Sequence, residues 1–314
     1  AINTNRFVMK DLEIIGVPRN KKFSPNHVGN DDAIFSLTIK ELEKQGYRVQ
    51  VYREDEFASL TQVPQKAIFT MAREKHLLKK LQALEVKGTV VVNSGFGIER
   101  CFRTNMTRNL ISNNIPYPKS FVVPTSYTGD NVFDQLTGKG YWIKRGDFHA
   151  IHKEDVTFAA SRQEARDILR EYQLRDIPDA VISEHLHGDL VKFYAVRGTN
   201  FFYWFYPYDH NHHKYADYEA INGKSLHHAF NEAELQRVAT ASAEALGIYI
   251  YGGDAIVNKD GSFHMIDVND WPSFAPCRDQ AAPYIAELLI EKFTNTSNEF
   301  IRYANQPEDQ SDLI

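Results

Sequence analysis

The chain has 314 residues, of which 43% are hydrophobic and 25% are charged, and its formal net charge is -5 at pH 7. This composition is typical of a globular protein with a sizeable core, and the length allows two or three domains. An acidic chain has no general basic surface, so nucleic acid is not an expected partner. Two cysteines are too few for a disulfide framework, which favours a cytoplasmic location, and no apolar run is long enough for a membrane span.

The first 95 residues alternate between apolar runs and amphipathic segments. Four runs predict strands, namely Leu12–Val17, Tyr47–Tyr52, Ala67–Met71 and Thr89–Asn93. The segments between them have apolar residues at helical spacing, so we predict a small doubly wound parallel sheet. Ligands bind such sheets where the strands end. Arg19, in the long basic loop after the first strand, is therefore a candidate substrate contact, and a solvated surface loop is the alternative.

A lysine lies inside a predicted strand near the middle of the chain. The run Tyr141–Arg145 is rich in aromatic residues and contains Lys144. A charged lysine is costly to bury unless an opposite charge pairs with it, and a phosphate group would supply that charge. The following loop, 146–153, has a single glycine, which weakens the case for a glycine-rich phosphate cradle there.

The segment Val181–Val196 predicts two strands that are joined by a short hinge. Glu184 lies at the end of the first strand, and Lys192 lies within the second. From the residues alone, the two side chains could form a cross-strand charge pair in a half-exposed hairpin.

A second hairpin is predicted over residues 249–270, with a turn at Asp260-Gly261. A two-residue turn there places Asp254 opposite Asp267, and Asn269 then lies on the same face because side chains alternate along a strand. Three oxygen-bearing side chains on one patch suit a hard cation such as Mg²⁺ that also binds phosphates. The alternative is that these polar residues only cap the hairpin.

The order and separation of these motifs resemble the ATP-grasp family, whose members use ATP to activate an acceptor. The resemblance is carried by Lys144, the hinge at Glu184, Asp254 and Asp267-x-Asn269, and it covers about residues 90–292. It implies an α/β fold in three parts. These are an N-terminal doubly wound domain (1–118), a central α+β lid (119–195) and a C-terminal antiparallel-sheet domain with the metal site (196–314).

The resemblance also implies Mg-ATP as the cofactor and a role for each matching residue. The phosphates would be held by Arg103, Lys144 and Lys192, and one or two Mg²⁺ ions by Asp254, Asp267 and Asn269. The adenine would meet Glu184 and the hinge residues His185 and Leu186, and the ribose would meet Asp189.

Most enzymes that the chain resembles are carboxylate–amine ligases, which form an acyl phosphate that an amine attacks to give a C–N bond. Small carboxylates and amines, with amino acids and peptides among them, are then the expected substrates, and a homodimer is an open alternative to a monomer. Many such ligases have an Arg before the first metal Asp, whereas this chain has Gly252-Gly253. A ligase would therefore need another cation near the reacting carbonyl, and Arg278 and Arg19 are the catalytic candidates.

Two other functions are open alternatives. The glycines before Asp254 and the hinge also resemble the inositol trisphosphate kinase branch, which phosphorylates a hydroxyl. Polyanionic substrates of that kind need a dense basic cleft, however, and this chain is acidic overall. A nucleotide-binding protein without turnover is the third hypothesis, and such a protein would be expected to lack a metal ligand. We therefore prefer the ligase.

Overall fold

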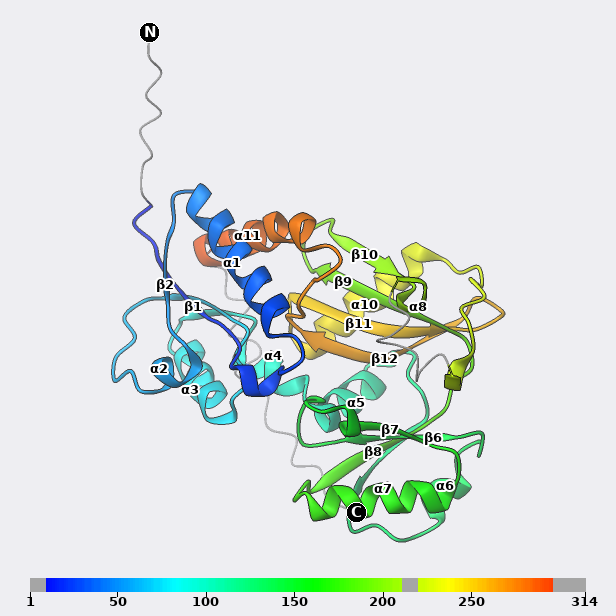
Figure 1. Ribbon diagram of the computed structural model, residues 1–314. Helices are drawn as coiled ribbons and strands as arrows, with labels where there is room; N and C mark the ends of the chain where they lie inside the picture. The colour runs from blue at the N-terminus through cyan, green and yellow to red at the C-terminus, as the bar shows by residue number, and fades with distance from the viewer. Residues whose placement is uncertain (1–9, 211–219, 296–314) are drawn as a thin grey trace. The chain divides into compact units, whose positions relative to one another are not determined.

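The computed structural model describes residues 10–210 and 220–295, which form two compact units (Figure 1). The first unit takes the described parts of 1–98 and 275–314, and the second unit is formed by the described parts of 99–274. Residues 99–118 thus group with the second unit, and the three-domain division at 118 and 195 stays a prediction. Within the described ranges, none of the helices combines the length and the apolar character that crossing a membrane requires.

The first unit contains a parallel sheet with the strand order β2-β1-β3-β4. Its strands are β1 (Glu13–Val17), β2 (Arg48–Val51), β3 (Ala67–Thr70) and β4 (Val90–Val92). Its helices are α1 (Val28–Lys44), α2 (Glu54–Ala58), α3 (Lys75–Val86) and α11 (Arg278–Thr294), with the 3-10 turn η1 (Lys21–Phe23) before α1. In this order β2 and β3 lie on opposite sides of β1, so the chain extends the sheet first in one direction and then in the other. Right-handed crossovers in the two directions place their helices on opposite faces of the sheet. The predicted doubly wound parallel sheet is therefore confirmed.

The second unit contains two antiparallel sheets. One has the order β5-β8-β6-β7 and is covered by α7 (Arg162–Leu174), whose Leu169 and Tyr172 lie in the same buried cluster as Ile143. Its strands are β5 (Ser120–Pro124), β6 (Tyr141–Arg145), β7 (Val156–Ala159) and β8 (Asp179–Glu184). Shorter elements at its margins are α6 (Asn131–Asp134) and η2 (Lys153–Asp155).

The other sheet of this unit has the order β10-β9-β11-β12. Its strands are β9 (Asp189–Val196), β10 (Phe202–Phe205), β11 (Ile250–Val257) and β12 (Phe263–Asp270), and the helices α5 (Arg103–Ser112), α8 (Pro207–His210) and α10 (Glu232–Leu246) belong to the same unit. The chain passes from the first unit to the second within α4 (Gly95–Arg100). One face of the sheet packs on α5 and α10, because Val191, Phe193 and Ala195 belong to the same core cluster as residues of both helices. Alternate residues such as Lys192 therefore lie on the opposite face.

A buried carboxyl group joins α3 to the segment that follows β4. Glu85 Oε2 accepts a hydrogen bond from the backbone N–H of Gly95 at 3.0 Å, and the side chain is buried. Burial raises the pKa of Glu85 to about 8, although hydrogen bonds from Ser94 and the Gly95 backbone act in the opposite direction. The folded protein therefore holds a proton here that the unfolded chain releases near its ordinary pKa of 4.5.

Because of this raised pKa, we predict that the protein loses stability as the pH rises from 4.5 to about 8. The loss attributable to Glu85 is roughly 3–5 kcal/mol, since each pKa unit corresponds to about 1.4 kcal/mol. Glu85→Gln should remove this loss and keep the Gly95 bond. Urea unfolding of both proteins at pH 5 and pH 8 measures the difference, with the exposed Glu43→Gln as the control. An unchanged pH dependence in Glu85→Gln would contradict the raised pKa.

Candidate functional site

The hairpin of β11 and β12 places Asp254 directly opposite Asp267, and Gly252 opposite Asn269. This predicted pairing is confirmed, but the predicted two-residue turn is wrong. Nearer the turn, Val257 pairs with Phe263, so the chain turns through three residues after Asn258. Three-residue hairpin loops need a residue with positive φ, which Gly261 supplies at 84°.

An irregularity between Asp254 and Ala255 restores the register that the longer turn would have shifted. Ala255 pairs with Met265 while Asp254 pairs with Asp267, which leaves Ile266 as the extra residue of a β-bulge. Without this bulge, Asp254 and Asp267 would not lie opposite each other. The longer turn and the bulge together therefore produce the pairing that the sequence predicts from a simpler hairpin.

Each carboxylate of the hairpin has a cationic partner from another element. Lys192 Nζ of β9 lies 3.1 Å from Asp254 Oδ1, and Arg103 Nη1 at the start of α5 lies 3.1 Å from Asp267 Oδ1. Burial raises the pKa of Asp254, and the nearby charge of Asp267 adds to the rise against the opposing effect of Lys192. Burial also opposes the charged form of Asp267, but Arg103 and other cations outweigh it and lower the pKa of that carboxyl.

A third cation, Lys144 of β6, reaches the same cluster. Its Nζ donates a hydrogen bond to the backbone carbonyl of the bulge residue Ile266 at 3.4 Å, and its side chain is buried. Burial lowers the pKa of Lys144 to about 7, and repulsion by Arg103 adds to this effect, whereas Asp267 and Asp254 oppose it. The structure thus brings three cationic side chains and two carboxylates together.

The oxygen atoms in this cluster suit a magnesium ion. Asp254 and Asp267 supply carboxylate oxygens, and Asn269 donates its amide N–H to Asp267 Oδ2 at 3.2 Å. The atom of Asn269 that can bind a cation is therefore its carbonyl Oδ1. Two carboxylates and an amide form a hard donor set that Mg²⁺ prefers. Across the described ranges, no group of three or more His, Cys, Asp or Glu residues could hold a metal by itself.

Close packing explains the two glycines that precede Asp254. A Cβ at Gly253 would lie 2.4 Å from the backbone carbonyl oxygen of Asp267, and a Cβ at Gly252 would lie 2.9 Å from the backbone carbonyl oxygen of Phe193. These separations are too short for any side chain without a rearrangement of the sheet. The arginine that many ligases have before this aspartate therefore has no room here.

The hinge between β8 and β9 lies beside an apolar cluster. Leu190 and Ile256 are buried and contact Leu186 and the bulge residue Ile266. Leu190 and Ile256 lie two residues from Lys192 and Asp254 on their strands, hence on the same face. Along this face, the side chains are apolar near the hinge and charged beside the carboxylates. A nucleotide has the same order, because a largely apolar base is followed by charged phosphates.

His185 of the hinge serves mainly the local fold. Its backbone N–H donates to the carbonyl of Gly140 at 3.0 Å, and its Nδ1 accepts from the indole of Trp142 at 3.1 Å. Burial lowers the pKa of His185 to about 4, and the neighbouring His187 contributes. The imidazole is therefore neutral near pH 7, and a base in this hinge would have to accept its backbone hydrogen bond from an N–H group other than that of His185.

The structure contradicts one interpretation of this segment and gives a local contact for another residue. Lys192 pairs with Asp254, while Glu184 lies in a different sheet opposite Tyr141, so the proposed charge pair between Glu184 and Lys192 is wrong. Asp189 is buried, and its two oxygens accept backbone N–H bonds from Leu226 and His228 at 2.7 Å each. Asp189 therefore binds the chain after α8, and its role at the ribose stays a prediction.

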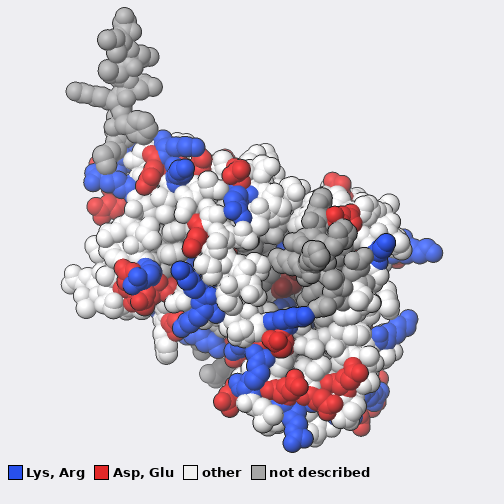
Figure 2. Space-filling model, in the orientation of Figure 1, with Lys and Arg blue, Asp and Glu red and all other residues white. Residues whose placement is uncertain are grey.

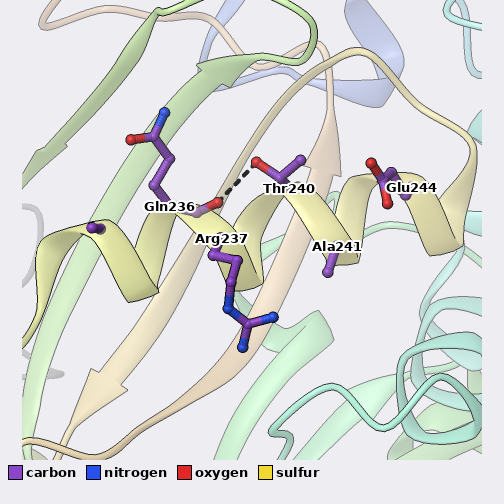
Figure 3. A pocket seen from close by; sticks show the side chains of 6 residues that line it. Gln236, Arg237, Thr240, Ala241 and Glu244 are labelled. Atoms are coloured by element: carbon purple, nitrogen blue, oxygen red, sulfur yellow. Dashed lines mark hydrogen bonds between the residues drawn. The ribbon is translucent and has the colours of Figure 1, made fainter.

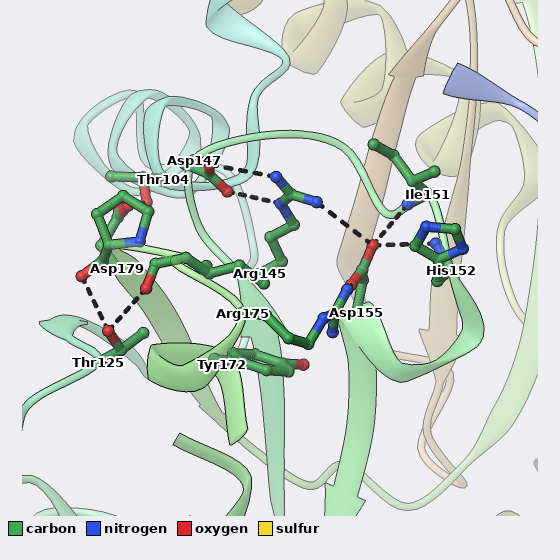
Figure 4. A network of polar contacts seen from close by, with 12 residues as sticks. Thr104, Thr125, Arg145, Asp147, Ile151, His152, Asp155, Tyr172, Arg175 and Asp179 are labelled. Carbon is green, nitrogen blue, oxygen red and sulfur yellow. Dashed lines mark hydrogen bonds and ion pairs between the residues drawn. The ribbon is translucent and has the colours of Figure 1, made fainter. Parts of the chain in front are cut away.

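The loop after β6 is held by carboxylates in place of additional glycines (Figure 4). Asp155 Oδ2 accepts the backbone N–H groups of Ile151 and His152 at 2.9 Å each, and Asp155 Oδ1 lies 2.6 Å from Arg175. Burial opposes ionisation of Asp155, but these bonds outweigh it and lower its pKa. Two backbone amides of the loop are thus committed to Asp155 and do not face a phosphate.

One residue of this loop, which sequence reasoning missed, pairs with the end of β12. His149 Nε2 lies 2.6 Å from Asp270 Oδ1, and both side chains are almost fully buried, with exposed fractions of 3% and 1%. Asp270 follows Asn269, and His149 also contacts Phe102, which precedes Arg103. The two residues of the pair are 121 positions apart, so no local pattern could have indicated it.

The two catalytic candidates from the sequence, Arg19 and Arg278, lie in the first unit. Arg19 Nη1 lies 3.3 Å from Asp31 Oδ2, and Arg278 Nη2 donates to Asn30 Oδ1 at 2.6 Å. Because Asn30 and Asp31 are neighbours in the first turn of α1, the two arginines come together there. The other predicted site residues lie in the second unit.

A surface hollow on α10 is unrelated to this cluster (Figure 3). It is lined by side chains of that helix, among them Arg237, Thr240 and Glu244. The helix covers the face of the sheet opposite to Asp254. The hollow therefore contributes nothing to the candidate site.

The arrangement of the sheets matches a known fold. No family model matches this sequence, and neither does a curated protein. Among solved structures, a RimK-domain ATP-grasp protein from Sphaerobacter thermophilus DSM 20745 is similar, with a TM-score of 0.63 at 14% identity, over 88% of this chain and 99% of that one. The D-alanine–D-alanine ligase of Bacillus anthracis in complex with ATP gives a TM-score of 0.63 at 14% identity, over 93% and 98%.

The ATP-grasp ligase PsnB in complex with a minimal precursor is also similar, with a TM-score of 0.58 at 14% identity, over 90% of this chain and 100% of that one. Similarity at this level of identity shows the fold. The chain therefore has the ATP-grasp fold, as its sequence motifs predicted.

The buried pair of His149 and Asp270 can be compared with a pair of the same chemistry at the surface. His227 and Asp209 are also 2.6 Å apart, but their exposed fractions are 54% and 37%. We predict that Asp270→Ala lowers the free energy of unfolding by about 2–4 kcal/mol, because it leaves a buried polar partner unsatisfied. Asp209→Ala should cost less than about 1 kcal/mol. Equal losses in urea unfolding would show that burial of the first pair is unimportant.

Proposed function

We propose that the protein is an ATP-dependent ligase that joins a carboxylate to an amine through an acyl phosphate. One observation carries the proposal, namely that Asp254 and Asp267 face each other with Lys192, Arg103 and Lys144 around them. Carboxylates that can hold Mg²⁺ and cations that can hold phosphates are what phosphoryl transfer from ATP requires. The ligases among the similar structures support the same choice.

In this proposal, the chain positions ATP and the acceptor, and no residue forms a covalent bond with either. The apolar residues Leu186, Leu190 and Ile256 receive the base at the hinge, and Lys192, Lys144 and Arg103 contact the phosphates. Bound Mg²⁺, held by Asp254, Asp267 and Asn269, would supply charge neutralisation at the transferred phosphate. The ion pairs of Lys192 and Arg103 with these carboxylates keep the site formed before ATP arrives.

The substrates in this proposal are small carboxylates and amines, with amino acids and peptides first among them. Two of the similar structures are named as a D-alanine–D-alanine ligase and as a ligase in complex with a minimal precursor. Mg-ATP is the cofactor, and a cytoplasmic location is part of the proposal. Gly253 leaves no room for an arginine before Asp254, so the cation near the reacting carbonyl has to come from elsewhere in the chain, and Arg278 and Arg19 are the candidates.

We predict that Lys144→Ala weakens the binding of Mg-ATP by tenfold or more. The expected loss is that of a charge-assisted hydrogen bond, about 1.5–3 kcal/mol, in a buried position. Isothermal titration calorimetry measures the affinity directly. Lys139→Ala, at an exposed lysine before the same strand, is the matched control and should bind ATP normally. If both variants bind alike, Lys144 has no place in the nucleotide site.

The ligase and the kinase alternative predict different fates for the γ-phosphate. With Mg-ATP and pooled amino acids and dipeptides, a ligase releases free phosphate and yields products with a new amide mass. Hydroxylamine in place of the amine should trap the acyl phosphate as a hydroxamate. A kinase would instead yield a stable phosphate ester that hydroxylamine leaves unchanged. Mass spectrometry separates the two products, and a phosphorylated inositol without any amide would overturn the ligase proposal.

A further inference from the structure

Helix α5 begins at Arg103 without a side-chain cap, because its N-cap residue is Phe102. The first backbone N–H groups of a helix have no partner within the helix and need one from elsewhere. The loop after β6 supplies two carbonyl groups. That of Phe148 accepts from the N–H of Arg103 at 3.4 Å, and that of Gly146 accepts from the N–H of Thr104 at 2.9 Å. Residues 146–149 therefore take the place of a cap for α5.

The single glycine of this loop is needed for that contact. A Cβ at Gly146 would lie 2.6 Å from Oγ1 of Thr104 and 2.7 Å from Oδ2 of Asp179, at the start of β8. These two atoms are joined, since Thr104 Oγ1 donates to Asp179 Oδ2. The N–H of Gly146 also donates to the backbone carbonyl of Asp179 at 2.9 Å. Glycine at this position thus lets the loop approach α5 and β8 closely, which is a reason other than a phosphate cradle.

The other end of the loop packs on the residue before Arg103. The rings of Phe148 and Phe102 have their centroids 4.7 Å apart, and both side chains are buried. His149, which pairs with Asp270, also contacts Phe102. The loop is therefore joined to β12 as well as to α5 and β8, and a shift of the loop would move the start of α5.

Arg103 is the charged residue whose position depends on this support. Charged side chains stand out over the surface in Figure 2, whereas Arg103 has an exposed fraction of only 5%. Its guanidinium lies 3.1 Å from Asp267, and its backbone N–H is bound by the loop. An error of about 1 Å in the position of such a group can lower the rate of a reaction by about a hundredfold.

We infer that Thr104 and Asp179 are positioning residues for Arg103. Their hydrogen bond holds residues 146–149 against the start of α5, and the carbonyl groups of the loop then fix the backbone from which the guanidinium projects. Neither residue has to contact a nucleotide in this role. The consequence for phosphate binding rests on the proposed function, whereas the effect on Arg103 itself does not.

Thr104→Val tests this role, because it keeps the shape of the side chain and removes the hydroxyl group that donates to Asp179. In the full chain without nucleotide, hydrogen exchange of the Arg103 guanidinium, measured by NMR, should become about tenfold faster, because its pair with Asp267 opens more often. Calorimetry should show that Mg-ATP binds about tenfold more weakly. Thr104→Ser restores the hydroxyl group and should recover both values.

The matched control is Thr125→Val (Figure 4). Thr125 and Thr104 are both buried, with exposed fractions of 5% and 8%, and Thr125 Oγ1 donates to the carbonyl of Ile177 at 2.7 Å, two residues before Asp179. Each variant thus removes one buried hydroxyl group from the same region, and urea unfolding should show a loss of stability in both. Thr125→Val should leave the guanidinium exchange and the Mg-ATP affinity as they are in the parent chain.

If Thr104→Val does not fold, Gly146→Ala decides the result, because its Cβ would press on Thr104 and Asp179 and displace the loop. Guanidinium exchange equal to that of Thr125→Val overturns the inference. Faster exchange in a chain whose parent binds no Mg-ATP would support the positioning of Arg103 and contradict the proposed function. The failure of one is therefore distinguished from the failure of the other.

Discussion

The second unit is organised around two carboxylates that face each other across a hairpin. Because Asp254 and Asp267 lie directly opposite each other, their negative charges repel, and burial raises the free-energy cost of each charge further. The unit compensates with cations from three other elements: Lys192 from β9, Arg103 from α5 and Lys144 from β6. A single electrostatic constraint thus joins both of its sheets and a helix.

This constraint also explains why the cluster is suited to a ligand. Lys192 and Arg103 are the partners of the carboxylates, and they are also the groups that would meet phosphate. In the proposed function, a bound Mg²⁺ would neutralise the two carboxylates, and Lys192 and Arg103 would then be able to pair with the phosphates. The folded protein therefore holds its charged groups in place at a cost that a ligand can lower, which is the meaning of a preorganised site.

The sequence predicted the features that depend on local alternation. The pairing of Asp254 with Asp267 follows from the two-residue period of strands, and it survived a longer turn only because the bulge at Ile266 corrected the register. Features that depend on distant contacts were out of reach. The bond of His149 to Asp270, 121 positions away, has no local signal, and neither do the backbone N–H bonds that Asp189 accepts from Leu226 and His228.

The glycine-poor loop after β6 shows how side chains can replace backbone freedom. A glycine-rich loop folds over phosphate because its backbone accepts unusual dihedral angles, and it offers its amides to the ligand. Here Asp155 takes two amides of the loop, and His149 ties the loop to the end of β12. The loop is therefore shaped before any ligand binds. If the proposed function holds, phosphate contacts depend more on the side chains of Lys144, Lys192 and Arg103 than on a nest of backbone amides, because Asp155 already occupies two amides of the loop.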